Sequence, residues 1–149
     1  MANIVGFGKA CELAKLHLSE NISHMKKLRD NLVATILREI PGVALNGHTE
    51  NRFSNNAHFT FLGVAGDDLI IKLDEYGICA STGSACSVHT QKASHVLQAM
   101  GFSHEQITGS LRLTLGLFNN QQQIDETVNI LKKVTAELRS VSPFKEKYS

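Results

Sequence analysis

Apolar residues recur at helical spacing through the first part of the chain, up to Ile40, with lysine, arginine and aspartate residues between them. This period predicts one long amphipathic helix that begins near Ile4. Pro41-Gly42 should end the helix, because proline has no N–H for the hydrogen-bond ladder and disfavours helical backbone in the residue before it. The predicted apolar face consists of Leu18, Ile22, Met25, Leu28, Leu32, Val33, Ile36, Leu37 and Ile40.

Shorter patterns after the proline predict β-strands. These segments are rich in β-branched and aromatic residues or alternate between apolar and polar residues, and the turn pair Asn46-Gly47 ends the first of them. The expected strands lie at 43–45, 56–62, 78–80 and 110–115.

Two shorter helices are expected between these strands. The first begins at Asp67 or Asp68, one of which would cap it, and runs to about Tyr76. Gly77 follows at the usual C-terminal position for glycine. The second short helix runs from about 94 to 100.

A final helix is predicted from a capping motif and a regular apolar face. Asn120 with Gln123 resembles a capping box. The apolar face consists of Ile124, Val128, Leu131, Val134 and Leu138. The chain therefore alternates helices and strands, which predicts an α/β (α+β) fold. We expect a two-layer sandwich, with a small mixed or antiparallel sheet of about four strands covered mainly on one side by the two long helices.

Composition is consistent with a single globular domain over residues 1–149. Hydrophobic residues make up 42% of the chain, and it contains no internal repeat, low-complexity tract or linker. Fifteen basic and 14 acidic side chains leave a net charge of +1, so bulk charge favours neither nucleic acid nor an anionic membrane as a partner.

The sequence also bears on the compartment. No apolar stretch approaches the roughly 20 residues that cross a bilayer, and the N-terminus lacks the pattern of a signal peptide, so we expect a cytoplasmic protein without membrane contact. Three cysteines, an odd number, argue against a disulfide framework and fit a reducing compartment.

The most distinctive segment for chemistry is 81–87, with the sequence Ser-Thr-Gly-Ser-Ala-Cys-Ser. Such small residues bury little apolar surface, so Cys86 is expected on accessible backbone. The residues by themselves leave two interpretations of Cys86 open, a nucleophilic thiol and an inert surface thiol. His89 is either a solvated side chain, which the pattern favours, or a local base for the thiol.

Arg112 interrupts an otherwise apolar segment. A guanidinium there is either one pole of a substrate site or a strand-edge group that points to solvent. Cys79 lies in an apolar segment and Cys11 on an apolar helix face, so both are expected to be small core residues. No CxxC or HxxxH motif accompanies Cys79 and Cys86, and we therefore expect no metal site.

Four segments, in order and spacing, resemble the C-terminal part of a cysteine desulfurase of the NifS/IscS type. This family is class V aminotransferase-like and belongs to fold type I of the pyridoxal phosphate enzymes. The segments are 4–10, the Cys86 loop, 94–101 and 110–116, with Ile124-Asp125 opening the last helix. The resemblance covers nearly the whole chain and implies a C-terminal small domain whose N-terminal, pyridoxal phosphate-binding domain is missing.

The resemblance implies roles for two residues. In that family the enzyme takes sulfur from L-cysteine, releases L-alanine and leaves a persulfide on a loop cysteine, which Cys86 matches. Arg112 matches the arginine that pairs with the substrate carboxylate. The family also implies a homodimer and a sulfur-acceptor protein for iron–sulfur cluster or thio-cofactor biosynthesis.

The family's Schiff-base lysine lies in the larger domain, and no lysine of this chain has its sequence setting. We therefore expect the isolated chain to bind no pyridoxal phosphate and to have no desulfurase activity. Two alternatives stay open. One is a stand-alone persulfide carrier or docking module without pyridoxal phosphate chemistry, and the other is a selenocysteine lyase domain.

Overall fold

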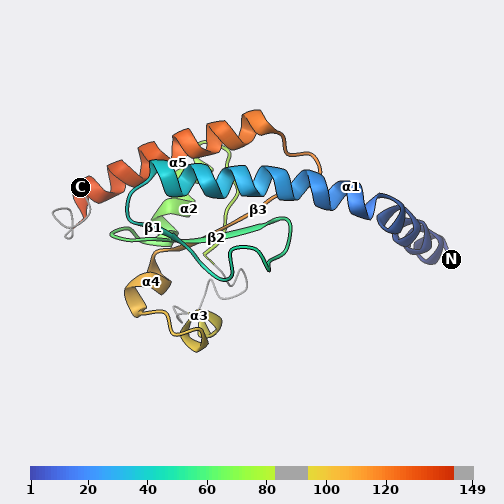
Figure 1. Cartoon of the computed structure of the whole chain (residues 1–149), viewed down its shortest axis with the longest axis horizontal. Coiled ribbons are helices and arrows are strands. Elements are labelled where there is room, and N and C mark those ends of the chain that lie inside the picture. Colours follow the sequence, from blue (N-terminus) through green and yellow to red (C-terminus); the bar gives the residue numbers. More distant parts are fainter. Residues whose placement is uncertain (83–93, 143–149) are drawn as a thin grey trace.

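The computed structural model describes residues 1–82 and 94–142, and its longest element is helix α1 (Ala2–Glu39), with 38 residues. The helix ends before Pro41 as predicted, and its cap residue, Ile40, has the extended backbone that a following proline favours. The C-terminal half of α1 packs on the molecule, whereas the N-terminal half projects from it (Figure 1). Within the described residues, no helix is long and apolar enough to cross a membrane.

The projecting half of α1 does not bury the apolar face that its period suggests. Residues 1–20 are all exposed, and Leu18 and Ile22 keep 55% and 41% of their surface in solvent. Burial begins at Leu28 and continues at Leu32 and Ile36, where the helix reaches the sheet.

The sheet is small and antiparallel. Its strands lie in the order β1 (Val43–Leu45), β2 (Asn56–Phe61) and β3 (Ser110–Thr114). Phe59 of the central strand pairs with Leu45 on one side and Leu111 on the other. Because side chains alternate along a strand, Phe59 and Phe61 point into the core, and His58 and Thr60 point to the opposite face.

Helices lie on both sides of this sheet. Helices α1, α2 and α5 pack on one face, and the short helices α3 and α4 lie toward the other (Figure 1). Their bounds are α2 (Gly66–Asp74), α3 (His95–Ala99), α4 (His104–Thr108) and α5 (Gln121–Val141). The predicted small antiparallel sheet with two long helices on one side is confirmed.

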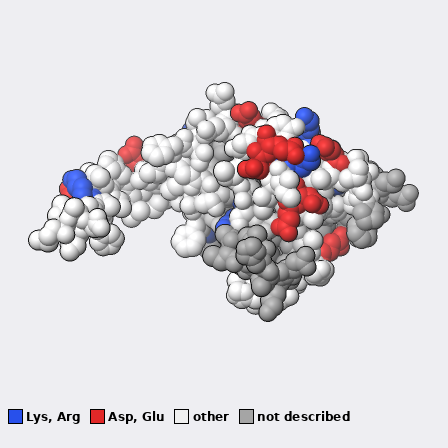
Figure 2. All heavy atoms as spheres, turned by 180° about the vertical axis from the view of Figure 1, so that it is seen from behind, with Lys and Arg blue, Asp and Glu red and all other residues white. Residues whose placement is uncertain are grey.

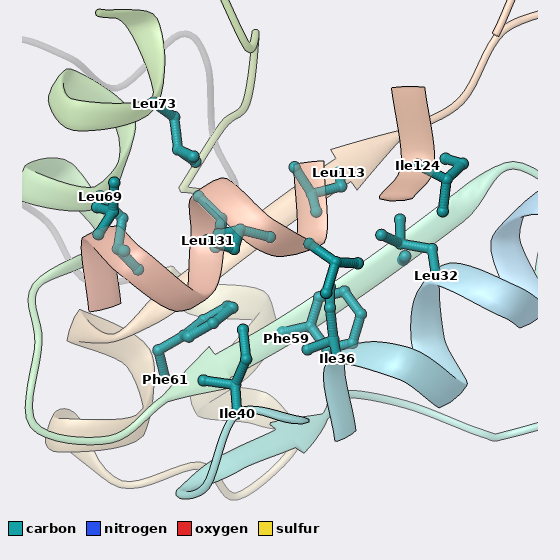
Figure 3. Packing of buried hydrophobic residues seen from close by; sticks show 14 of the residues in the cluster. Leu32, Ile36, Ile40, Phe59, Phe61, Leu69, Leu73, Leu113, Ile124 and Leu131 are labelled. Carbon is teal, nitrogen blue, oxygen red and sulfur yellow. The ribbon is translucent and has the colours of Figure 1, made fainter. Parts of the chain in front are cut away.

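The core lies between the sheet and helices α1, α2 and α5 (Figure 3). The rings of Phe59 and Phe61 meet edge to face, with centroids 6.1 Å apart. Leu32, Leu69 and Leu131 reach them from the three helices, and each such buried side chain contributes roughly 1.5–3 kcal/mol. The predicted apolar face of α5 is confirmed, and Asn120 and Gln123 form the predicted capping box.

The segment 78–80 is not a strand, so the described residues form three strands instead of about four. Gly77 has a positive φ of 73°, and the N–H of Ile78 donates back to the Leu73 carbonyl, which ties the start of the segment to the end of α2. Pairing with β3 begins only at Ser81.

Two helix starts differ from the predictions. Neither Asp67 nor Asp68 caps α2, because the N-cap residue is Ala65. Both aspartates lie in the first helical turn, where their negative charges interact favourably with the helix dipole. Helix α4 was not predicted, although Ser103 and Gln106 form a capping box that marks its start.

Candidate functional site

Arg112 lies in the middle of β3, between the buried residues Leu111 and Leu113. Alternation places its side chain on the face of the sheet opposite the core, where it is half-buried. This position is neither a core position nor a fully solvated one.

The backbone of Arg112 is joined to the start of the segment that carries Cys86. Its N–H donates to the Ser81 carbonyl at 2.6 Å, and the Ser81 N–H donates to the Arg112 carbonyl at 3.1 Å. The Ser110 hydroxyl donates to the Thr82 carbonyl at 3.2 Å. These bonds place residues 81–82 directly beside β3. Cys86 and His89 lie outside the described residues.

Two glycines allow this close approach. A Cβ on Gly66 would meet the carbonyl oxygen of Ser110 and the side chain of Thr82, and a Cβ on Gly109 would meet the carbonyl oxygen of Phe61. At these two positions only glycine permits the observed distances. They bring together the start of α2, the end of β2 and residues 81–82, which anchor the segment that leads to Cys86.

His58 of β2 is the cross-strand partner of Arg112 and lies on the same face of the sheet. Burial, together with the positive charges of Arg112 and Arg52, lowers the pKa of His58 to about 4. The imidazole is therefore neutral at pH 7. The sequence alone gave no signal for His58, because the pairing depends on the register of two strands far apart in the chain.

Arg52 lies near this face and is incompletely paired. Its Nη2 donates to the Asn46 carbonyl at 2.5 Å, whereas its Nε and Nη1 are buried without a partner among the described residues. Burial lowers the pKa of Arg52, and the charge of Arg29 adds to that effect. The Thr60 hydroxyl donates to Asn46 at 3.0 Å, so the polar face continues to the end of β1.

The other two cysteines are exposed, which corrects the expectation that they are core residues. Cys79 lies in the segment 78–80, which does not join the sheet, and its side chain lies outward between the half-buried Ile78 and Ala80. Cys11 lies on the projecting half of α1, where no other described element packs.

The described residues fit an anion at Arg112 better than they fit pyridoxal phosphate. Every lysine in the segments 1–82 and 94–142 lies on α1, α2 or α5, the helices that pack on the other face of the sheet. Lys72 pairs with Glu75 at 3.2 Å, and Lys133 donates to the Tyr76 hydroxyl at 2.9 Å. The described residues thus provide no amine beside Arg112 for a Schiff base. They also contain no cluster of metal-ligating side chains.

A groove of about 480 Å³ opens between α5 and the segment after α2. Tyr76 and Cys79 line one wall, and Gln123 and Glu126 line another. Neither Arg112 nor His58 borders it, so it is separate from the candidate site. On the face shown in Figure 2, acidic side chains predominate over the body of the molecule.

Known proteins resemble the chain over most of its length. Residues 1–127 match the family model of aminotransferase class-V. The cysteine desulfurase IscS of Dictyoglomus turgidum is 38% identical over 99% of this chain, and cysteine desulfurase IscS 1 of Archaeoglobus fulgidus is 43% identical over 94%. The match covers 38% and 36% of those two relatives, so the chain spans little more than a third of their length.

Solved structures agree with this result. A NifS-like protein from Rickettsia africae superposes with a TM-score of 0.76 at 29% identity, over 88% of this chain and 33% of that protein. A second NifS-like protein superposes with a TM-score of 0.78 at 30% identity, over 91% of this chain and 33% of that protein. With its sequence matches and its fold in agreement, the chain belongs to the aminotransferase class-V family, and the two curated relatives described above are cysteine desulfurases.

Proposed function

We propose that residues 1–149 are the C-terminal small domain of a cysteine desulfurase, which takes sulfur from L-cysteine, releases L-alanine and holds the sulfur as a persulfide on Cys86. The observation that carries this proposal is the pair of backbone hydrogen bonds between Ser81 and Arg112, at 2.6 and 3.1 Å. These bonds join the segment that leads to Cys86 to the strand that carries the guanidinium. Similarity to curated cysteine desulfurases along nearly the whole chain supports the same function.

In this proposal, Arg112 binds the carboxylate of the amino acid substrate. A guanidinium presents parallel N–H donors that match the two oxygens of a carboxylate. Its half-buried position strengthens the interaction, because fewer water molecules compete for the donors than at an exposed site.

Cys86 is the nucleophile. Its thiolate attacks the sulfur of the bound substrate, and a sulfur–sulfur bond forms as the carbon–sulfur bond breaks. The electron pair of the broken bond stays with the carbon, which takes up a proton and leaves as alanine. The outer sulfur of the persulfide is then passed to an acceptor protein. Four residues of extended chain reach at most about 14 Å, so the distance from Thr82 keeps the thiol near the substrate that Arg112 holds.

The remaining parts of the site belong to a portion of the protein outside this chain. Pyridoxal phosphate, when bound there, supplies the electron sink that makes the carbon–sulfur bond cleavable. This chain spans 38% and 36% of the length of two desulfurase relatives, which leaves room for a cofactor-binding domain. The intact protein acts as a cytoplasmic homodimer and supplies sulfur for iron–sulfur clusters or thio-cofactors, whereas the isolated chain is inactive.

The experiment compares two forms of the protein, the whole polypeptide that carries this chain and the chain by itself. With L-cysteine and pyridoxal phosphate, the whole polypeptide should form alanine, and peptide mass spectrometry should find an added sulfur atom on Cys86. Cys86→Ala should keep the absorbance of the bound cofactor and lose the persulfide. Cys79→Ala is the matched control, since this exposed thiol should be dispensable.

Persulfide formation that persists in Cys86→Ala contradicts the assignment of the nucleophile. The isolated chain should form neither alanine nor a lysine adduct with pyridoxal phosphate that borohydride can trap. A trapped adduct on a lysine of this chain contradicts the proposal that the cofactor is held elsewhere.

A further inference from the structure

The neighbourhood of Arg112 is set by the hydrogen-bond pattern of the sheet. In an antiparallel pair, opposite residues alternate between those that exchange backbone bonds and those that do not. The backbone N–H and carbonyl of Arg112 both bond to Ser81, on the edge of β3 away from β2. The carbonyl of His58 accepts from the Asn46 N–H, on the edge of β2 away from β3. His58 and Arg112 are therefore a non-hydrogen-bonded pair, the kind in which the Cα atoms are only about 4.5 Å apart and side chains are closest.

The other polar side chains beside this pair are engaged elsewhere. Thr60 and Ser110 are the next cross-strand pair on the same face. The Thr60 hydroxyl bonds to Asn46 and to the Gln106 carbonyl, and the Ser110 hydroxyl donates to the Thr82 carbonyl. Among the described residues, Asn46 and Arg52 near this face keep unpaired N–H donors, whereas Nε2 of His58 is an unpaired atom that can accept a hydrogen bond.

Nε2 of His58 is enclosed and has no hydrogen-bond partner among the described residues. An enclosed polar atom without a partner costs free energy, so a site that retains one usually has a use for it. The positive charges of Arg112 and Arg52 both lower the pKa of His58. Two cations favour the tautomer that presents the bare lone pair of Nε2 to them and carries its proton on Nδ1.

We propose that His58 is a positioning residue for Arg112: when the guanidinium binds a carboxylate, one of its N–H groups donates a hydrogen bond to Nε2 of His58, which holds the guanidinium with its plane toward that carboxylate. This inference rests on the proposed function, in which Arg112 binds the carboxylate of the substrate. A guanidinium has five N–H donors and a carboxylate takes two of them, so the number of donors allows a further bond to the imidazole. A neutral imidazole accepts this bond without adding a third positive charge to the site.

The test uses the 149-residue chain itself, with sodium acetate as the carboxylate probe at constant ionic strength. NMR follows the Nε–H of Arg112 and the ring protons of His58. His58→Gln keeps a side-chain acceptor, and His58→Leu removes it while keeping a similar size. Arg112→Gln removes the guanidinium, and thermal unfolding of every variant checks its fold.

We expect saturable acetate-dependent shifts in the wild-type chain. The affinity should stay within about threefold in His58→Gln and fall about tenfold in His58→Leu, since one hydrogen bond to a charged group accounts for a factor of about ten. With acetate bound, exchange of the Arg112 Nε–H with water should be slow in the wild type and His58→Gln, and fast in His58→Leu. A purely structural role of His58 would change the unfolding temperature without this difference between Gln and Leu.

The two proposals fail in different ways. Wild-type affinity and slow exchange in His58→Leu overturn the role of His58 and leave that of Arg112 intact. A wild-type chain without saturable binding, or binding that survives Arg112→Gln, overturns the carboxylate role of Arg112. If His58→Leu does not fold, His58→Ser replaces it under the same criteria, because serine removes the ring without adding an apolar group.

Discussion

Several arginine side chains of this chain are partly or fully buried. Their hydrogen-bond partners distinguish their roles. Arg139 of α5 is 7% exposed and donates to the carbonyls of Leu62 and Pro41, which ties the end of the helix to two turns. Arg29 of α1 is 2% exposed and donates to Asp30 and to the Phe53 carbonyl. Both guanidiniums therefore hold the fold together, whereas Arg112 lies on the polar face beside a histidine.

At the same scale, His58 predicts a pH dependence of stability. In the unfolded chain a histidine takes up a proton near pH 6.5, whereas folded His58 does so only near its pKa of about 4. Between these values the unfolded state binds more protons, so the free energy of unfolding should fall as the pH is lowered through this range. Urea unfolding of the wild type and His58→Gln at about pH 7 and about pH 4.5 measures the effect.

The wild type should lose more stability than His58→Gln over that interval, because other titrating groups are common to both. Equal losses in the two proteins would show that folding does not lower the pKa of His58.

At the scale of elements, the site depends on how closely backbones approach. The end of β2, the start of β3 and the first turn of α2 meet at Gly109 and Gly66, and the segment that leads to Cys86 is anchored at the same place. Gly109 has an ordinary φ of −83°, so glycine is required there by space and not by conformation. This packing gives the anchor of the Cys86 segment a fixed position relative to Arg112.

Gly109→Ala should therefore destabilise the chain by about 1–3 kcal/mol, because the added Cβ would force the backbone of β2 away. The matched control is Gly8→Ala, a helical position with open space around it, where alanine should not lower stability. Denaturant unfolding of both variants measures the difference. A Gly109→Ala chain as stable as the wild type would contradict this account of the packing.

At the scale of the whole molecule, the most unusual feature is the projecting half of α1 (Figure 1). This extension is mostly uncharged on the face shown in Figure 2. Its apolar side chains are largely in solvent, with exposures of 71% for Ile4, 73% for Phe7 and 71% for Leu16. Exposed apolar surface of this kind favours association, and the net charge of +1 opposes it little.

We therefore expect the purified chain to associate as its concentration rises. The triple variant Ile4→Ser, Phe7→Ser and Leu16→Ser should remain monomeric and keep the unfolding midpoint of the body, because these residues lie outside the core. Sedimentation equilibrium over a range of concentrations measures the mass of both proteins. Wild-type chain that stays monomeric at the highest concentration would contradict the prediction.

Local signals predicted most of the elements. The apolar period, Pro41 and the Asn120 capping box located α1 and α5, since these features act within a few residues of chain. The same signals failed for the segment 78–80, because strand formation requires a partner and the chain meets β3 only at Ser81. They also failed for Cys79, whose exposure follows from that missing strand.

The sequence by itself determined the fold class, the main helices and the candidate residues Cys86 and Arg112, because period, caps and motifs are properties of neighbouring positions. Only the tertiary structure decided that Arg112 meets Ser81 by backbone bonds and His58 across the strands. Strand register brings together residues that are far apart in the chain, and no local pattern encodes that pairing. For this protein, local sequence motifs identified the candidate residues, and strand pairing brings Arg112 beside Ser81 and His58.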